Sequence, residues 1–481
     1  MNAHQNPDTI IDGPLYASDK KVYPQAVHGR FRRIKWAFMA VALGLYYFLP
    51  FLRWSRGVGA PDQAVLLDIP HRKFYFFFIE LWPQEVYYFT GLLILASLTL
   101  FLLNAVAGRV WCGYMCPQTV WTDLFYAIER WVEGDRRDRM RKDKEKLTPK
   151  RVWELTVKHS LWLMVGWWTG GAWVLYFYDA PTLVRDLATF HADPTAYIWI
   201  AILTASTYML AGHMREQVCV YMCPWPRIQA ALTDEWALNV TYRGDRGEPR
   251  ISAKKAIALR ARGEPAGDCV DCRQCVAVCP TGVDIRKGSQ LACIQCGLCI
   301  DACDNVMMDI GRPTGLIAYD NDLNAGRRSA GLPEVYKLVR PRTVLYVALI
   351  GVVGGIMTYA LVNKKWTGVN VLHDRNPLAV QMSDGSIRNG YTVRLLNKNS
   401  DARTFRLSLE GLPGAQLQIS GEAVSATQPE IKVEPDQTLE LRLLITTPAD
   451  AIPREAANIV VVAEDETTGV FARARDHFFP K

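Results

Sequence analysis

The feature that most constrains this chain is a set of long apolar runs separated by stretches dense in charge. Crossing a bilayer as a helix takes roughly 20 consecutive, mostly apolar residues. Five runs meet or approach this requirement, at residues 36–52, 86–107, 160–178, 196–212 and 343–362. We therefore predict a multidomain membrane protein with an α-helical transmembrane bundle of about five spans. Half of the 481 residues are hydrophobic while the mean hydropathy is 0.00, so polar domains must accompany the spans. A small cytosolic enzyme and a disordered or fibrous protein are excluded.

Basic residues near the span ends predict the orientation, because Lys and Arg gather on the cytoplasmic side. Residues 30–35 are rich in Arg and Lys, residues 108–158 carry a dense basic run, and residues 179–195 hold only Arg185. The N-terminus is therefore expected in the cytoplasm and, after five spans, the C-terminal domain outside. Residues 1–35 are polar, so no cleavable signal is expected. The basic run is interpreted as a solvated helix beside anionic lipid rather than a nucleic-acid site. Residues 74–82 are too short to span and are predicted to be interfacial or re-entrant.

Residues 363–481 have a different pattern, in which apolar residues alternate with polar ones over short runs. Such runs occur at 391–395, 405–409, 417–419, 431–433, 439–443 and 459–462, separated by Gly, Pro, Asn and Asp. Period-two patterning at this spacing predicts an immunoglobulin-like β-sandwich of about seven strands. No catalytic constellation is visible in it, so a docking module is expected.

Two cysteine motifs between the fourth and fifth predicted spans carry the strongest chemical signal. Residues 269–280 are C-x-x-C-x-x-C-x-x-x-C-P, and residues 293–303 repeat the spacing, with Asp304 where Pro is usual. Three closely spaced thiolates bind three corners of a 4Fe–4S cluster, and the fourth comes from the other motif. The predicted ligands are Cys269, Cys272, Cys275 and Cys303 for the first cluster and Cys293, Cys296, Cys299 and Cys279 for the second. Structural zinc is the alternative, but zinc has no need of this triple spacing.

Four further cysteines lie in a duplicated motif at the ends of the second and fourth predicted spans. Cys112 and Cys116 occur in one C-x-Y-M-C-P sequence, and Cys219 and Cys223 in the other. Cysteines four apart share one face of a helix, and thiolate and thioether are soft ligands suited to Cu(I). We predict that these four form one catalytic copper site. The alternative is that small cysteines simply pack at helix ends. His159 and His213 lie nearby but are left out of the site.

With these motifs in order along nearly the whole chain, the sequence resembles the cytochrome c oxidase accessory proteins CcoG, also called FixG or RdxA. The resemblance implies a proteobacterial inner-membrane protein that reduces Cu(II) to Cu(I) during assembly of cbb-type cytochrome c oxidase. It also implies oxidase assembly factors and a copper transporter or chaperone as partners, besides membrane lipid and an electron donor that the sequence does not identify. Cys112, Cys116, Cys219 and Cys223 match the family's membrane cysteines, and the eight cysteines of residues 269–303 match its cluster ligands.

Two other functions stay open at this stage. Membrane ferredoxins of the NapH and NosR type share the C-x-x-x-C-P pairs, which would make the protein a quinol- or ferredoxin-linked electron conduit. The second alternative function is a non-enzymatic scaffold for oxidase assembly. The predicted domains are a cytoplasmic segment at 1–35, a membrane domain at 36–212, a ferredoxin-type domain at 213–342, a fifth helix at 343–362 and the periplasmic sandwich at 363–481.

Overall fold

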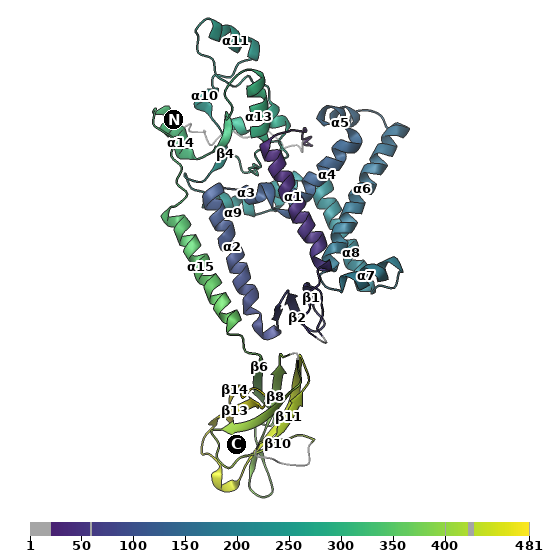
Figure 1. The fold of residues 1–481 in the computed structure, drawn as a ribbon, viewed down its shortest axis with the longest axis vertical. Coiled ribbons are helices and arrows are strands. Elements are labelled where there is room, and N and C mark those ends of the chain that lie inside the picture. Colours follow the sequence, from purple (N-terminus) through teal and green to yellow (C-terminus); the bar gives the residue numbers. More distant parts are fainter. Residues whose placement is uncertain (1–20, 58–59, 400, 422–427, 481) are drawn as a thin grey trace, which may run out of the picture. The chain divides into compact units, whose positions relative to one another are not determined.

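The computed structural model describes residues 21–57, 60–399, 401–421 and 428–480, which form two compact units (Figure 1). One unit joins residues up to 54 with 63–355, and the other joins 55–62 with 356–481. The first unit contains the cysteine motifs and most of the apolar helices. The second contains the C-terminal strands.

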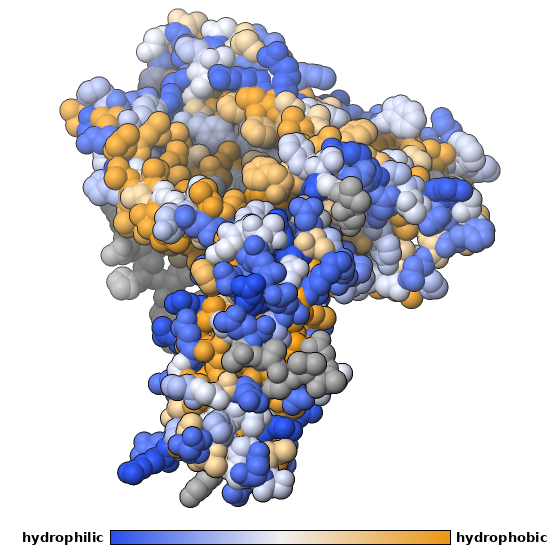
Figure 2. Space-filling model, turned by 60° about the horizontal axis from the view of Figure 1, so that its bottom comes forward, coloured by the Kyte–Doolittle hydropathy of each residue, from blue (hydrophilic) through white to orange (hydrophobic). Residues whose placement is uncertain are grey.

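Four helices in the described part of the chain are long and apolar enough to cross a membrane. They are α1 (Arg30–Phe48) continued by η1 (Leu49–Phe51), α2 (Tyr87–Ala107), α8 (Pro194–Thr207) continued by the π-helix η3 (Tyr208–Met214), and α15 (Pro341–Val362). Large apolar side chains such as Leu93, Val352 and Ile356 stay exposed on them. Figure 2 shows broad apolar surface of this kind. Four of the five predicted spans therefore coincide with helices that could lie in lipid.

The remaining predicted span, 160–178, falls in α6 (Pro149–Val174), which is not among these four helices. The helix carries Arg151 and Lys158 in its first half and ends four residues before the predicted span does. The count of five spans therefore stays a prediction. Glycines let α6 approach α8 closely, since a Cβ at Gly170 would lie 3.0 Å from the carbonyl oxygen of Ile200. This is the small-residue packing common between membrane helices.

Residues 74–82 form part of a three-stranded antiparallel sheet of β1 (Val65–Asp68), β2 (Lys73–Phe76) and β3 (Ile79–Leu81). The prediction that this segment is interfacial or re-entrant is not tested by the sheet itself.

The cysteine motifs lie among short elements that follow the apolar helices. Strands β4 (Asn239–Tyr242) and β5 (Ile317–Asp320) pair antiparallel and bracket the two motifs in the sequence. The other helices of this unit are α3 (Val110–Tyr114), α4 (Pro117–Glu133), α5 (Arg136–Lys142), α7 (Ala180–Ala188), η4 (Val218–Met222), α9 (Trp225–Leu232), α10 (Gly244–Gly247), α11 (Ala253–Ala261), α12 (Gln274–Ala277), α13 (Leu298–Asp309) and α14 (Asp322–Ser329).

The C-terminal unit is a β-sandwich, as predicted. One sheet has the order β10 (Gln416–Ile419), β12 (Gln437–Thr447), β8 (Ile387–Asn397), β6 (Thr367–His373), with β7 (Val380–Gln381) also paired to β8. The other has the order β11 (Glu430–Val433), β9 (Arg403–Glu410), β13 (Ala457–Asp465), β14 (Phe471–Phe478). Alternate residues such as Val393, Leu407 and Val461 are fully buried between the sheets, because successive side chains of a strand point to opposite faces.

Candidate iron–sulfur and thiol sites

The two cysteine motifs at 269–303 adopt the same local backbone. In each motif, the residues just before and just after the second cysteine are left-handed: Asp271 and Arg273 in one, Gln295 and Gly297 in the other. A helix then starts at once, α12 after Arg273 and α13 after Gly297. Non-glycine residues adopt this conformation at a cost, which is commonly found where a ligand is held. The repeated turn bends the chain so that three closely spaced thiols share one side.

Electrostatic interactions connect thiols of the two motifs. Burial raises the pKa of the Cys303 thiol to about 12, and Cys275, Cys272 and Cys269 raise it further. Burial likewise raises the pKa of Cys293 to about 12, with Cys296 and Cys279 adding to the shift. Burial raises the pKa of Cys299 well above its ordinary value, and Cys296, Cys279, Cys293 and Cys275 of the first predicted set add to the shift. These interactions link thiols of both motifs, and the assignment of each cysteine to one cluster stays a prediction.

The second set surrounds a common space. Cys279, Cys293, Cys296 and Cys299 all line one cavity, which Cys275 of the first set also reaches. Because burial raises the pKa of Cys293, Cys296 and Cys299, their thiolate forms need nearby positive charge, which the irons of a cluster would provide. A cluster also binds each thiolate at a separate corner, so the thiols need not meet at one point. The residues present therefore fit two 4Fe–4S clusters.

We expect purified protein to contain about eight iron and eight sulfide per chain, because each of the two cubanes holds four irons and four sulfides. Anaerobic iron and sulfide analysis is the measurement. Cys272→Ser and Cys296→Ser should each impair one cluster and leave the electron paramagnetic resonance signal of the other. Zinc in place of iron, in protein made under conditions that permit cluster assembly, would contradict the assignment.

The four thiols of the duplicated motif, Cys112, Cys116, Cys219 and Cys223, are called the membrane thiols. They lie at breaks between helices rather than on one helix face. Cys112 is in α3, but that helix ends before Cys116, which is the N-cap residue of α4. Cys219 is in the π-helix η4, and Cys223 follows its end. The prediction that each pair shares a helix face is therefore wrong, because a new helix begins next to the second cysteine of each pair, α4 at Pro117 and α9 after its N-cap residue Pro224. π-Helical turns are frequent at functional sites.

All four membrane thiols nevertheless lie close enough to interact. Burial raises the pKa of Cys112 to about 12, and Cys116, Cys219 and Cys223 add to the shift. Burial also raises the pKa of Cys219 to about 12, with contributions from Cys116 and Cys223. Among the described residues, no three His, Cys, Asp or Glu side chains converge in a geometry that could hold one metal ion. The four thiols are thus gathered but do not surround a single point.

The first membrane motif packs directly on the second cluster motif. Cys112 packs in one apolar cluster with Ile294 and Cys296. The Tyr114 hydroxyl donates to the carbonyl of Cys296 at 2.9 Å, and Gly113 has no room for a side chain, since a Cβ would lie 2.8 Å from the carbonyl oxygen of Ile294. The second cluster position is therefore the one next to the membrane thiols.

Two charged residues extend this junction. The Arg109 guanidinium donates to the carbonyls of Cys293 at 3.3 Å and Pro226 at 2.8 Å, so it ties the cluster motif to α9, the helix that follows the second membrane motif. Lys35 of α1 is buried, lies 3.8 Å from the Asp123 carboxylate, and lines a small cavity with Cys219 and Pro280. Sequence reasoning missed Gly113, Tyr114 and Lys35; only the position of the first two inside the duplicated motif could have suggested them.

His159 and His213, which the sequence leaves out of the site, lie apart from the thiols. Their rings stack with centroids 5.9 Å apart, and the Tyr208 hydroxyl is 2.9 Å from His159 Nδ1. They line a pocket with Arg215 and Glu216, and none of the cysteines belongs to its lining.

Comparison with known proteins agrees with this arrangement. Residues 214–322 match the family of 4Fe–4S dicluster domains, 89–135 match a 4Fe–4S binding domain, and 357–481 match the IG-like fold at the C-terminus of FixG. The nitrogen fixation protein FixG of Rhizobium meliloti is 47% identical over 95% of this chain and 92% of its own. The chain belongs to the FixG/RdxA family.

Other members and one solved structure complete the comparison. The protein RdxA of Cereibacter sphaeroides is 48% identical over 92% of this chain and 93% of its own. The crystal structure of a FixG-related protein from Vibrio parahaemolyticus matches 24% of this chain and 96% of its own at 22% identity, with a TM-score of 0.21. As a member of the FixG/RdxA family with iron–sulfur domains and apolar helices, this chain is a membrane-associated iron–sulfur electron-transfer protein.

Proposed function

We propose that this protein is a cupric reductase, in which one electron from the iron–sulfur centres converts each Cu(II) to Cu(I) beside the membrane cysteines. The observation that carries the proposal is the direct packing of Cys112 against the Cys296 segment. A buried cluster position in contact with a group of soft thiols gives a short path for electrons. Thiolates favour Cu(I), so the group would also hold the product.

The residues of the chain support an order of electron flow. Cys272 of the first set is exposed, whereas Cys296 of the second is buried. The thiols of the two sets also interact, since Cys275 contributes to the raised pKa of Cys299. When bound, 4Fe–4S clusters supply one-electron transfer. We infer that an external donor reduces the first position, and that the second faces the copper thiols.

Arg109 and Tyr114 act in this proposal as positioning residues. Their hydrogen bonds go to backbone carbonyls of the cluster motif, so they fix its distance from Cys112 without binding copper. The resemblance to the family implies that the Cu(I) product is used in oxidase assembly. The β-sandwich is the proposed docking module for an assembly factor or a copper carrier.

The test is anaerobic incubation of reductant-supplied protein with Cu(II), with Cu(I) measured by a Cu(I)-specific chelator. Catalytic Cu(I) formation above that of cluster-free protein supports the reductase. Cluster reduction by quinol without any copper reduction would favour the electron conduit. Normal oxidase assembly in cells after replacement of all eight cluster cysteines would favour the scaffold.

Orientation is part of the proposal, with the cysteine motifs in the cytoplasm and the sandwich in the periplasm. The support is the basic stretch between α4 and α6, because Lys and Arg near span ends stay inside. Alkaline phosphatase fused after Lys481 should be active, and the same enzyme fused at Lys146 should be inactive. Two inactive fusions would show that an even number of spans follows Lys146, and the reverse pattern would contradict the proposed orientation.

A further inference from the structure

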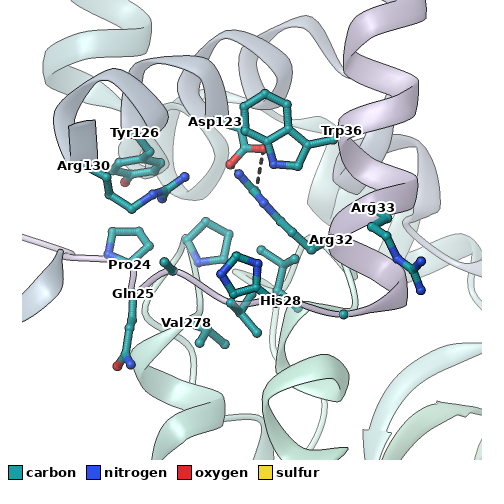
Figure 3. Close-up of a pocket in the computed structure, with 15 residues that line it drawn as sticks. Pro24, Gln25, His28, Arg32, Arg33, Trp36, Asp123, Tyr126, Arg130 and Val278 are labelled. Carbon is teal, nitrogen blue, oxygen red and sulfur yellow. Dashed lines mark hydrogen bonds and ion pairs between the residues drawn. The ribbon is translucent and has the colours of Figure 1, made fainter. Parts of the chain in front are cut away.

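A cavity of about 650 Å³ lies where the first apolar helix begins (Figure 3). It is bounded by the extended stretch 24–29, the first turns of α1 and one side of α4. Val278 and Pro280, the residues on either side of Cys279, line it as well. Its volume is within the range of about 300–1,000 Å³ typical of small-molecule sites. The cavity thus joins the start of a candidate membrane helix to the second cluster motif.

Two guanidinium groups reach into this cavity, and only one is neutralised. Arg32 donates to both carboxylate oxygens of Asp123 at 2.8 Å. Arg130 extends from α4 toward Arg32 (Figure 3), yet its guanidinium forms no ion pair or hydrogen bond with any residue that the structure describes. Burial lowers the pKa of Arg130 and the charge of Arg32 lowers it further, while Asp123 and Asp135 oppose this from a longer range.

The shortage of negative charge is local. Asp123 is shared, because Lys35 lies 3.8 Å from its other side. Asp135 accepts a hydrogen bond from the backbone nitrogen of Ala26 at 3.0 Å, so it is already engaged outside the cavity. The imidazole of His28 also lies in the cavity (Figure 3). A partly buried cation without a partner loses some of its hydration, and an anion between the two guanidiniums would compensate for that loss.

We propose that this cavity binds an anion of the phosphate class between Arg130 and Arg32. Arginine is suited to this role because its planar donors match phosphate oxygens in pairs. The phosphate is either the headgroup of an anionic phospholipid or a free phosphate group. A headgroup could reach the cavity because the cavity lies at the start of an apolar helix. Once bound, it ties the stretch 24–29 to α4 beside Cys279. This inference does not depend on copper reduction.

The test uses the full-length holoprotein in nanodiscs of phosphatidylcholine alone or of phosphatidylcholine with phosphatidylglycerol. Binding of inorganic phosphate is followed by calorimetry in the first, and retained phosphatidylglycerol by native mass spectrometry in the second. Binding of phosphate identifies a free anion, and retention of phosphatidylglycerol alone identifies a headgroup. Either result supports the site; no binding of either probe overturns it.

Arg130→Gln should weaken binding roughly tenfold or more, because hydrogen bonds to charged groups are among the strong ones. Arg30→Gln is the matched control, since Arg30 begins the same helix but is exposed and is not among the residues that line the cavity, so binding should be unchanged. Cluster absorbance checks the fold of each variant, and His28→Asn provides a second test should Arg130→Gln fail to fold. Wild-type affinity in both cavity variants would overturn the proposal.

Discussion

Replacing Cys112, Cys116, Cys219 and Cys223 together by serine should nearly abolish copper binding and copper reduction while the cluster absorbance persists. A hydroxyl is a much poorer ligand for Cu(I) than a thiolate. Loss of even an outer hydrogen-bond partner costs about 10- to 100-fold in metal affinity, so loss of four thiols should cost at least as much. The clusters should survive because none of the four belongs to the two sets within residues 269–303. Equilibrium dialysis with Cu(I) and the chelator assay measure the two effects.

Tyr221→Phe is the matched control for this variant. Tyr221 is in the second C-x-Y-M-C-P motif but is 74% exposed, so its replacement should leave both copper binding and reduction at the wild-type level. If the four-serine variant reduces Cu(II) as fast as wild type, the copper site is elsewhere and the pairs are structural. Loss of cluster absorbance in that variant would instead mean that these cysteines support the clusters.

The second large effect is expected for Gly113→Ala. The new Cβ would lie 2.8 Å from the carbonyl oxygen of Ile294 and 3.0 Å from Cys296 Cα, both backbone atoms that cannot rotate away. The cluster motif must therefore shift, at a cost of about 1–3 kcal/mol typical of overpacking. Copper-dependent reoxidation of the clusters should slow several-fold, which stopped-flow absorbance measures. The melting temperature should also fall.

Gly171→Ala controls for helix propensity. Gly171 is also helical, but nothing lies within 4 Å of a Cβ placed there. Alanine is favoured over glycine in a helix by about 1 kcal/mol, so this variant should be at least as stable as wild type and equally fast. Wild-type kinetics in Gly113→Ala would show that the contact between the two motifs does not govern electron transfer.

Much of the fold could be predicted from residue patterns that are local in the sequence. Apolar runs indicated four helices that the structure contains, and alternation indicated the strands near Val393, Leu407 and Val461. Strand β14 was missed because its outward positions carry charges such as Arg473 and Arg475, while its buried residues include the small Ala472. Strand β6 was missed for a different reason, since the exposed Leu372 places an apolar residue on its outward face and obscures the alternation.

The sequence allowed a prediction of the cluster ligands, but not of the contacts between the cysteine motifs. Cysteine spacing is sufficient to divide the eight thiols into two sets, because the chemistry of a cluster dictates that spacing. The packing of Gly113 on Ile294 depends on contacts between segments about 180 residues apart (294 − 113), which no local pattern encodes. The helix breaks at Met115 and Met222 were misjudged, since the spacing of four residues was interpreted as one continuous helix.

Single-turnover oxidation of the reduced protein by Cu(II) tests the central claim most directly. The protein is fully reduced under anaerobic conditions, freed of excess reductant, and mixed with Cu(II) while the cluster absorbance and the Cu(I) chelate are recorded together. Two clusters that each hold one transferable electron should yield about two Cu(I) per chain, formed at the rate at which the clusters reoxidise. Reduced clusters that persist in the presence of Cu(II), or that reoxidise without forming Cu(I), would contradict the account.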